Sequence, residues 1–262
     1  MGPYAARNVG RESWRHRVKK PAAVLVLASG GLDSCVLIAH YAGAGREVFP
    51  LFVRSGLVWE SAELSALRRW LRALPSGIAA TVRPLTVLPV PAVDLYGRHW
   101  STTGRKTPGW RAADNSVYLP GRNILLLSKA AVFAAMRGIP AIAAAPLRGN
   151  TFPDASPSFF RSFARGLAVG LDFPIRIETP FLRSEKHTLI ARYRDLPLHL
   201  TLSCSTPRRG RHCGRCAKCR ERVLAFRRAG AQDAATLATE RQLRVSGGPA
   251  SPPIRRRSRP PG

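Results

Sequence analysis

The stretch that decides the fold runs from residue 22 to residue 34 and reads AAVLVLASGGLDS. Its first half, Val24–Ala28, is an unbroken apolar run of the kind that forms a buried strand in a parallel sheet. Two glycines follow, and Ser34–Tyr41 continues as an apolar helix that stops near Gly43. A strand, a glycine-rich turn and a helix in this order aim free backbone N–H groups at an anion, and the helix end adds about half a positive charge.

The turn Ser29–Ser34 carries the groups that bind phosphate. Gly30 and Gly31 allow the backbone to approach a ligand closely, and the hydroxyls at both ends of the turn can donate to phosphate oxygens. Asp33, at the start of the helix, is either a cap or a ligand of a Mg²⁺ ion that the phosphates share. The alternative interpretation is a tight turn that binds nothing; the complete Ser-Gly-Gly-x-Asp-Ser string favours the ligand.

A Walker loop would add a lysine that serves transfer of the γ-phosphate, and this turn has none. The absence of that lysine fits a site where the α-phosphorus of ATP is attacked. Pyrophosphate is then the leaving group, and the turn would hold it as it departs.

Strands and helices alternate along the chain, which predicts an α/β fold with a doubly wound, mostly parallel sheet. Pro50 inside the second strand argues for an edge strand or a bulge. Residues 91–117 lack periodicity and predict an insertion or a mobile loop. The expected strands are Val24–Ala28, Val48–Val53, Ile78–Val82, Leu85–Leu88, Ala141–Ala145 and Ile175–Glu178, and the expected helices are Ser34–Tyr41, Glu60–Leu74, Asn123–Arg137, Pro157–Val169 and Glu185–Tyr193.

Four cysteines stand close together near the C-terminal end, at Cys204, Cys213, Cys216 and Cys219. Two consecutive C-x-x-C steps and one longer arm suit a closed tetrahedral Zn²⁺ site with a structural role. An iron–sulfur cluster is the alternative, because four thiolates suit both. Disulfides are disfavoured because the rest of the chain is typical of a cytosolic protein. Cys35 lies apart on an apolar helix and is expected in the core.

The chain is strongly basic: its 262 residues carry a formal net charge of +27, with a pI near 11.6. Residues 1–20 hold six Lys/Arg and residues 244–262 hold five Arg, so both ends are expected to be disordered arms. The charge indicates either a surface for nucleic acid or an Arg-rich protein that acts on an anionic small molecule. No apolar stretch approaches the ~20 residues of a membrane helix, and we expect a cytoplasmic protein.

The turn resembles the PP-loop of the adenine-nucleotide α-hydrolase superfamily, ATP pyrophosphatases that adenylate a carbonyl or carboxylate before a nucleophile displaces AMP. Together with the four cysteines, it is similar to the 7-cyano-7-deazaguanine synthase family of queuosine-precursor biosynthesis. The resemblance covers about Ala22 to Gly230. Its further stretches are LPGRNILLLSKAAVFAA, FPDASPSFFRSFARGLAVG, TPFLRSEKHTLI and LTLSCSTPRRGRHCGRCAKCRERVLAFRRAG.

This resemblance implies an ATP-dependent carbon–nitrogen ligase that converts 7-carboxy-7-deazaguanine and ammonia into the 7-cyano base. The carboxylate would attack the α-phosphorus, giving an acyl-adenylate and pyrophosphate, and ammonia would then give the amide. A second activation and loss of the oxygen would give the nitrile. ATP, Mg²⁺ and a structural Zn²⁺ are the implied cofactors, and the ammonia would come from solution or from a partner.

The resemblance also divides the chain and assigns its residues. We expect a basic arm at 1–20, a PP-loop ATP pyrophosphatase domain at 21–200, a Cys₄ zinc module with a following helix at 201–230 and a basic tail at 231–262. Catalytic roles are expected for Asp33, Ser34 and Lys186. The residues expected to bind ATP are Ala28, Ser29, Gly30, Gly31, Leu32, Asp33, Ser34, Cys35, Val36, Leu37, Arg122 and Asn123.

Several of these residues have a plainer interpretation. Arg122 and Asn123 can be no more than a helix start, and Lys186 can be an exposed helix lysine. Asp154 stands before a helix and is expected to cap that helix rather than act as a base. The carboxylates Glu60 and Glu63 are expected on a solvated helix face.

The chain departs from the family pattern at Arg54, Ala155, Arg183 and Leu202, where the family commonly has Tyr, Cys, Asp and Trp. These departures leave the acceptor substrate open. One alternative is a related PP-loop ATP pyrophosphatase that acts on another carboxylate or on tRNA. A second is a non-enzymatic basic zinc protein that binds nucleic acid through its tails. A homodimer is consistent with the sequence, which does not fix the oligomeric state.

Overall fold

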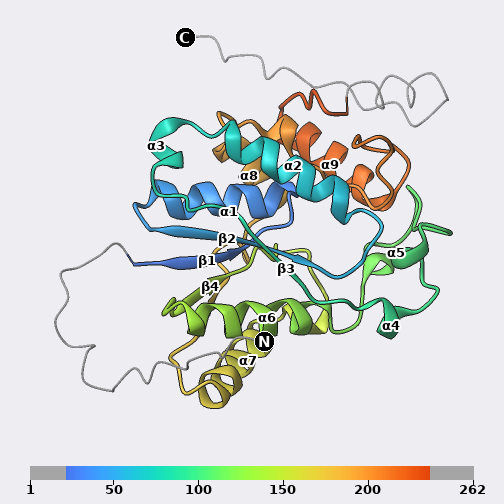
Figure 1. Cartoon of the computed structure of the whole chain (residues 1–262). Helices are drawn as coiled ribbons and strands as arrows, with labels where there is room; N and C mark the ends of the chain where they lie inside the picture. Colours follow the sequence, from blue (N-terminus) through green and yellow to red (C-terminus); the bar gives the residue numbers. More distant parts are fainter. Residues whose placement is uncertain (1–21, 237–262) are drawn as a thin grey trace, which may run out of the picture.

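The structure of the protein, a computed structural model, describes residues 22–236 and is built on a parallel sheet (Figure 1). The five strands of this sheet stand in the order β3-β2-β1-β4-β5, and every neighbouring pair is parallel. Val26 of the central strand lies opposite Pro50 on one side and Ala143 on the other. The strands are β1 (Val24–Leu27), β2 (Val48–Arg54), β3 (Thr86–Pro89), β4 (Ala141–Ala143) and β5 (Arg176–Glu178).

Helices cover both faces of the sheet, which confirms the doubly wound α/β fold (Figure 1). One face carries α1 (Leu32–Gly43), α2 (Glu60–Arg72), α3 (Ser76–Ala79), α8 (Lys186–Arg192) and α9 (Ala217–Arg228). The other face carries α6 (Arg122–Met136) and α7 (Pro157–Gly170). The remaining short elements are α4 (Val93–Tyr96), α5 (Trp100–Thr103), η1 (Asp114–Val117), η2 (Pro153–Ala155) and η3 (Leu198–Leu200).

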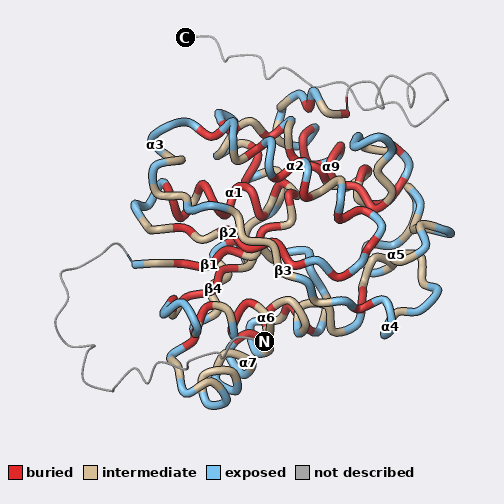
Figure 2. Tube along the Cα trace, in the orientation of Figure 1, coloured by how far each residue is buried: buried red, intermediate tan, exposed pale blue. Residues whose placement is uncertain are grey.

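Alternate side chains of the central strand pack into two separate hydrophobic layers. Val24 and Val26 join the layer under α1 and α2, which contains the fully buried Trp70. Leu25 points the other way and packs with α6. Figure 2 shows that the buried residues follow the strands and the inner faces of these helices. Each large apolar side chain enclosed in this way contributes about 1.5–3 kcal/mol, which holds the ends of β1 in a fixed place.

The chain reverses its direction across the sheet between β1 and β4. It builds β1, β2 and β3 toward one edge and then returns to place β4 and β5 on the opposite side of β1. Parallel α/β sheets bind ligands at the carboxyl ends of the strands where this reversal occurs. The turn that follows β1 and the segment that follows β4 therefore mark the expected site.

One of the expected strands is wrong. The segment Ile78–Val82 is not a strand: its first two residues are the end of α3, the next two form a turn, and only Val82 makes a bridge to Val48. A short apolar run does not distinguish a strand from a buried turn of helix.

Of the two alternatives for Pro50, the edge strand is wrong, because β2 lies inside the sheet. The bulge fits, because Val48 pairs with Val82 and Leu51 with Thr86, which leaves one extra residue on the partner segment. Val48 bonds to the backbone of Thr81 and Arg83, and pairing with β3 resumes at Leu51. Pro50 falls at the gap between these two stretches, where the ladder tolerates a residue that has no N–H.

Residues 91–117 also contain more regular structure than their sequence predicts, because α4, α5 and η1 lie within them. Gly109 bridges to Cys216, and Ala217 donates to the carbonyl of Pro108. This segment is therefore bonded to the cysteine-rich part of the chain. None of the helices within residues 22–236 is long and apolar enough to cross a membrane.

A buried ion pair joins α9 to the end of the described chain. Arg222 donates from Nε to one oxygen of Asp233 over 2.6 Å and from a terminal nitrogen to the other over 3.0 Å. Its remaining N–H groups donate to Thr201 and to the carbonyl of Leu198. Both partners are almost completely enclosed, so each depends on the other for charge compensation.

Replacing Asp233 with Ala should lower the free energy of unfolding by about 3–5 kcal/mol, because it leaves a buried guanidinium without its anion. Urea denaturation measures this loss. The matched control is Asp195→Ala, at an exposed carboxylate, which should change stability by less than about 0.5 kcal/mol. Equal effects at the two positions would contradict the buried pair.

Candidate functional site

The turn after β1 is held in one shape by its own hydroxyl groups. The N–H of Ser29 donates to Ser34 Oγ over 3.0 Å, and the N–H of Gly31 donates to Ser29 Oγ over 3.2 Å. Ser34 Oγ donates to the carbonyl of Gly31 over 3.0 Å. The N-cap residue of α1 is Gly31, which has no side chain to cap the helix, and α1 begins at the carboxyl edge of the sheet directly after β1. An uncapped helix N-terminus at this edge is a ready site for an anion.

Gly30 lets the turn lie directly against α2. Its φ of +81° is in the left-handed region, and a Cβ there would lie 2.3 Å from the carbonyl oxygen of Glu63. On the other side, the carbonyl of Gly30 accepts from the N–H of Leu202 over 2.9 Å. The turn is therefore fixed between α2 and the segment that leads into the cysteines.

Two neighbouring cavities meet at the turn. The smaller, about 240 Å³, is lined by the turn, by the ends of β1 and β2 and by the start of α6. The larger, about 830 Å³, extends from Asp33 across the segment after β4 to α8 and α9. Both contain Asp33, Pro146 and Asn150, so a ligand at the turn can extend into either one.

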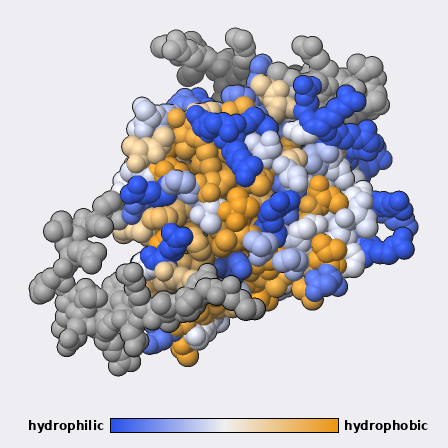
Figure 3. Space-filling model, viewed as in Figure 1, coloured by the Kyte–Doolittle hydropathy of each residue, from blue (hydrophilic) through white to orange (hydrophobic). Residues whose placement is uncertain are grey.

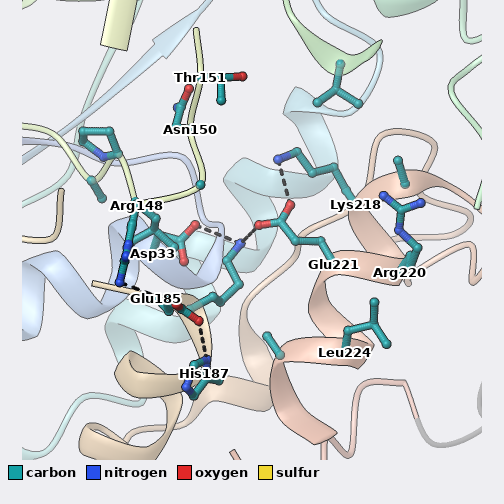
Figure 4. Close-up of a pocket in the computed structure, with 18 of the residues that line it drawn as sticks. Asp33, Arg148, Asn150, Thr151, Glu185, His187, Lys218, Arg220, Glu221 and Leu224 are labelled. Carbon is teal, nitrogen blue, oxygen red and sulfur yellow. Dashed lines mark hydrogen bonds and ion pairs between the residues drawn. The ribbon is translucent and has the colours of Figure 1, made fainter. Parts of the chain in front are cut away.

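Four charged groups meet where the larger cavity reaches the turn (Figure 4). Lys186 Nζ lies 3.0 Å from Asp33 Oδ2 and 2.5 Å from Glu221 Oε1. Lys218 Nζ lies 2.9 Å from the other oxygen of Glu221. The Lys186 side chain is only 10% exposed, so it is not the exposed helix lysine of the plainer interpretation.

The proton affinities of these groups follow from their contacts. Burial acts to lower the pKa of Lys186, but the carboxylates of Asp33 and Glu221 outweigh it and raise that pKa. Burial raises the pKa of Asp33, against the opposing effect of Lys186. Burial acts likewise on Glu221, but the two lysines hold its pKa below the usual range. Asp33 Oδ1 is buried with no hydrogen-bond partner among the described residues, which leaves it free to bind a cation.

The start of α6 forms the opposite wall of the smaller cavity. Arg122 and Asn123 both line this cavity. Arg122 Nε is buried and has no hydrogen-bond partner among the described residues. The N–H of Asn123 donates to Asp154 Oδ2 over 2.9 Å. Asp154 therefore caps α6, and its expected role as the cap of the following helix is wrong, because Ser156 caps α7. A sequence cannot show that a cap comes from a residue so distant along the chain.

Glu60 and Glu63 are not on a solvated face as expected. Glu60 is 2% exposed and accepts from the N–H groups of Ser55 and Gly56, which fixes the chain after β2. Glu63 is half-buried and lines the smaller cavity. Its loss of solvent raises its pKa to about 8, against the opposing effect of Arg122.

The four cysteines converge at the N-terminus of α9. Their Sγ atoms all lie within 4.8 Å of one another. Three of the separations are 3.5 Å between Cys216 and Cys219, 3.9 Å between Cys213 and Cys219, and 4.0 Å between Cys204 and Cys216. Zn–S bonds of about 2.3 Å in a tetrahedron require sulfur separations of about 3.8 Å, so the four atoms fit around one ion.

Comparison with known proteins identifies the family of this chain. The family model described as queuosine biosynthesis protein QueC matches residues 23–230. The chain belongs to the QueC family. The resemblance on which the sequence analysis relied is therefore confirmed.

Two curated relatives of this QueC chain carry the name 7-cyano-7-deazaguanine synthase. The protein from Anaeromyxobacter dehalogenans is 34% identical over 227 residues, covering 80% of this chain and 93% of the relative. The protein from Leptospira interrogans serovar copenhageni is 29% identical over 221 residues, covering 80% and 88%. Among solved structures, a 4-thiouridine synthetase in complex with RNA and ATP gives a TM-score of 0.44 at 13% identity, covering 86% of this chain and 54% of that one, a similarity too low to support an inference.

Not every residue expected to bind ATP faces a cavity of this QueC chain. Asp33, Ser34, Arg122 and Asn123 line the smaller one with Ala28 and Ser29, and Lys186 lines the larger. The side chains of Leu32, Cys35, Val36 and Leu37 are buried in the core, which confirms the expected core position of Cys35. These four can serve a ligand only through their backbone, and the ATP-binding role of the set stays a prediction.

Lys218 and Glu221 reach the larger cavity from α9, and the sequence predicts neither of them there. Lys218 lies between the last two cysteines, where its nearness to a metal site hides any other role. The sequence did contain one indication of this pair, because Lys218 and Glu221 have opposite charges and an i, i+3 spacing at the start of a helix. Which way this helix face points, however, depends on how α9 packs on α8.

Replacing Gly30 with Ala should lower the free energy of unfolding by roughly 2–5 kcal/mol, because the new Cβ meets the backbone of α2 at a strained φ. Thermal and urea denaturation measure this change. Gly77→Ala in α3 is the matched control, since its Cβ meets nothing within 4 Å. The proposed close approach would be contradicted if Gly30→Ala were as mild as Gly77→Ala.

Proposed function

We propose that this chain is an ATP-dependent ligase that makes 7-cyano-7-deazaguanine from 7-carboxy-7-deazaguanine and ammonia. The observation that carries the proposal is the uncapped, glycine-bent turn at the carboxyl end of β1, facing a cluster of two lysines and two carboxylates. Membership in the QueC family and the printed names of its relatives support the same activity.

In this proposal the turn holds the two outer phosphates of ATP. The backbone N–H groups at the start of α1 and the hydroxyls of Ser29 and Ser34 would donate to the phosphate oxygens. Lys186 would exchange a carboxylate partner for a phosphate as pyrophosphate separates from the α-phosphorus. Such positioning and charge stabilisation are the main sources of catalysis when the chemistry lies in the substrates. Ser34 Oγ, now bonded to Gly31, supplies one of these donors without any change of the backbone.

A Mg²⁺ ion fits the same place. Asp33 Oδ1 is a buried carboxylate oxygen without a hydrogen-bond partner among the described residues, at the turn where the phosphates would lie. Mg²⁺ prefers one or two carboxylates together with phosphate oxygens. The ion would neutralise charge that develops on the leaving pyrophosphate, and Asp33 would hold it.

The acceptor is assigned to the larger cavity, which has room for a planar base beside the nucleotide. The four departures from the family pattern do not argue against this. Arg54 and Arg183 are exposed, Ala155 and Leu202 are buried, and none of them lines either cavity. A carboxylate bound near Asn150 would lie between the turn and α8, within reach of an α-phosphorus at the junction of the two cavities.

The cysteine cluster is assigned to one Zn²⁺ ion. Four sulfur atoms that converge on one point suit a single tetrahedral ion, whereas an iron–sulfur cluster spreads its thiolates over several iron atoms. Four thiolates leave no open position on the metal, so its role is structural. The ion would fix the start of α9, the helix that carries Lys218 and Glu221 into the larger cavity.

Pyrophosphate release tests the proposed function directly. With ATP, Mg²⁺ and ammonia present, 7-carboxy-7-deazaguanine should trigger release of pyrophosphate and AMP and formation of the nitrile, detected by mass spectrometry. Other aromatic carboxylates and unmodified tRNA serve as control acceptors. Pyrophosphate release only with one of these controls would contradict the assigned acceptor while leaving the use of ATP intact.

Replacing Cys204 with Ser should abolish stoichiometric Zn²⁺, because one of four thiolates is lost. Metal binding at such sites contributes on the order of 10 kcal/mol or more to local folding, so the segment around α9 should become protease-sensitive. Metal content by atomic spectroscopy and limited proteolysis are the measurements. Cys35→Ser, at the remaining cysteine, is the control and should keep the metal. Iron rather than zinc in the purified protein would contradict the assignment.

A further inference from the structure

The helix α9, which begins among the cysteines, contributes two charged side chains to the larger cavity. Lys218 and Glu221 of α9 line the same cavity as Asp33 and Lys186. In Figure 4 the Glu221 carboxylate points from α9 toward the side of the cavity that carries Asp33, and Lys218 reaches over it. The ammonium group of Lys186 contacts this carboxylate. No other acidic side chain of α9 reaches this place, because Glu221 is the only Asp or Glu in the helix.

These four groups form one chain of ion pairs whose charges cancel. Asp33 contacts Lys186, Lys186 contacts Glu221, and Glu221 contacts Lys218. Two ammonium groups and two carboxylates have no net charge, so the cluster as it stands does not attract a polyanion. A pyrophosphoryl group therefore gains from both lysines only after a carboxylate has left its place between them.

The four side chains differ in how easily they can move. Lys186 is 10% exposed, and a buried ammonium needs an anionic partner at all times. Glu221 and Lys218 are 37% and 41% exposed, so they can change rotamer toward solvent at small cost. Glu221 is thus the partner that can be exchanged, while Lys186 stays.

We infer that Glu221 holds the place of the departing pyrophosphoryl group and that Lys218 is part of the subsite that binds it. When ATP occupies the turn, its outer phosphates displace the Glu221 carboxylate and take Lys186 and Lys218 as partners. The inference rests on the proposed function, since it concerns the same nucleotide. It adds α9 to the nucleotide site. This part of the site lies next to the cysteines, because Cys216 is the N-cap residue of α9 and Cys219 lies in its first turn.

Calorimetric titration of magnesium pyrophosphate into the zinc-loaded full chain tests the inference without any turnover. Glu221→Gln removes the competing anion and should bind pyrophosphate roughly three- to tenfold more tightly than the unaltered protein. Lys218→Gln should bind it more weakly by roughly the same factor, and Lys218→Arg should restore most of the affinity. If Glu221 and Lys218 only stabilised the fold, their replacement would not change pyrophosphate affinity in opposite directions.

Two remote variants control for net charge. Glu47→Gln removes a carboxylate that pairs with Arg83 near the amino end of β2, and Lys106→Gln removes an exposed lysine. Both should leave pyrophosphate affinity within about twofold. Zinc content and melting temperature are recorded for every variant. If Glu221→Gln does not keep its zinc, the comparison of Lys218→Gln with Lys218→Arg decides.

Weaker or unchanged pyrophosphate binding by zinc-loaded Glu221→Gln would overturn the placeholder role. Unchanged binding by Lys218→Gln would remove α9 from the subsite. Either result can occur in a protein that still releases pyrophosphate with its acceptor, so the inference can fail while the proposed function stands. Failure of the proposed function would instead be seen in the turnover assay, as an absence of pyrophosphate release.

Discussion

The close contact between Gly30 and the backbone of α2 is the constraint on which the rest of the site depends. There is no room for a side chain at this position, so the turn after β1 has a single path. That path opens the N-terminus of α1 toward the edge of the sheet where the chain reverses direction. The enclosed central strand fixes one end of the turn, and the carbonyl of Gly30 fixes the other against Leu202.

A hydrogen bond from the N–H of Leu202 to the carbonyl of Gly30 joins the two parts of the chain that the sequence presents as separate modules. Leu202 packs with the cysteines while its N–H holds the turn, and α9 returns from the cysteines to the cleft through Glu221 and Lys186. Figure 3 shows strongly hydrophilic residues along the right-hand edge of the molecule, where Figure 1 places α5 and the nearby cysteine-rich segment. Because Leu202 holds the turn and α9 carries Glu221, a metal ion at the cysteines would act on the nucleotide site through the backbone, although it would touch no substrate.

Local patterns could be predicted from the sequence, and contacts between distant segments could not. Residues close together in the chain specify the strand, turn and helix at residues 24–43, and likewise the group of four cysteines. Both could therefore be predicted from the sequence. Asp154 caps α6 by accepting from Asn123, thirty-one residues earlier in the chain, and the burial of Glu60 depends on the chain after β2. Lys218 and Glu221 reach the cleft only because of the angle at which α9 packs. The strand expected at Ile78–Val82 shows the limit of short apolar runs.

The glycine turn is proposed to hold the two outer phosphates of ATP. A crystal structure of the zinc-loaded protein with magnesium and α,β-methylene-ATP, which cannot release pyrophosphate, tests it most directly. The β- and γ-phosphates should lie within hydrogen-bond distance of the backbone N–H groups at the start of α1 and of the hydroxyls of Ser29 and Ser34. A triphosphate bound elsewhere, with the turn empty, would contradict the account.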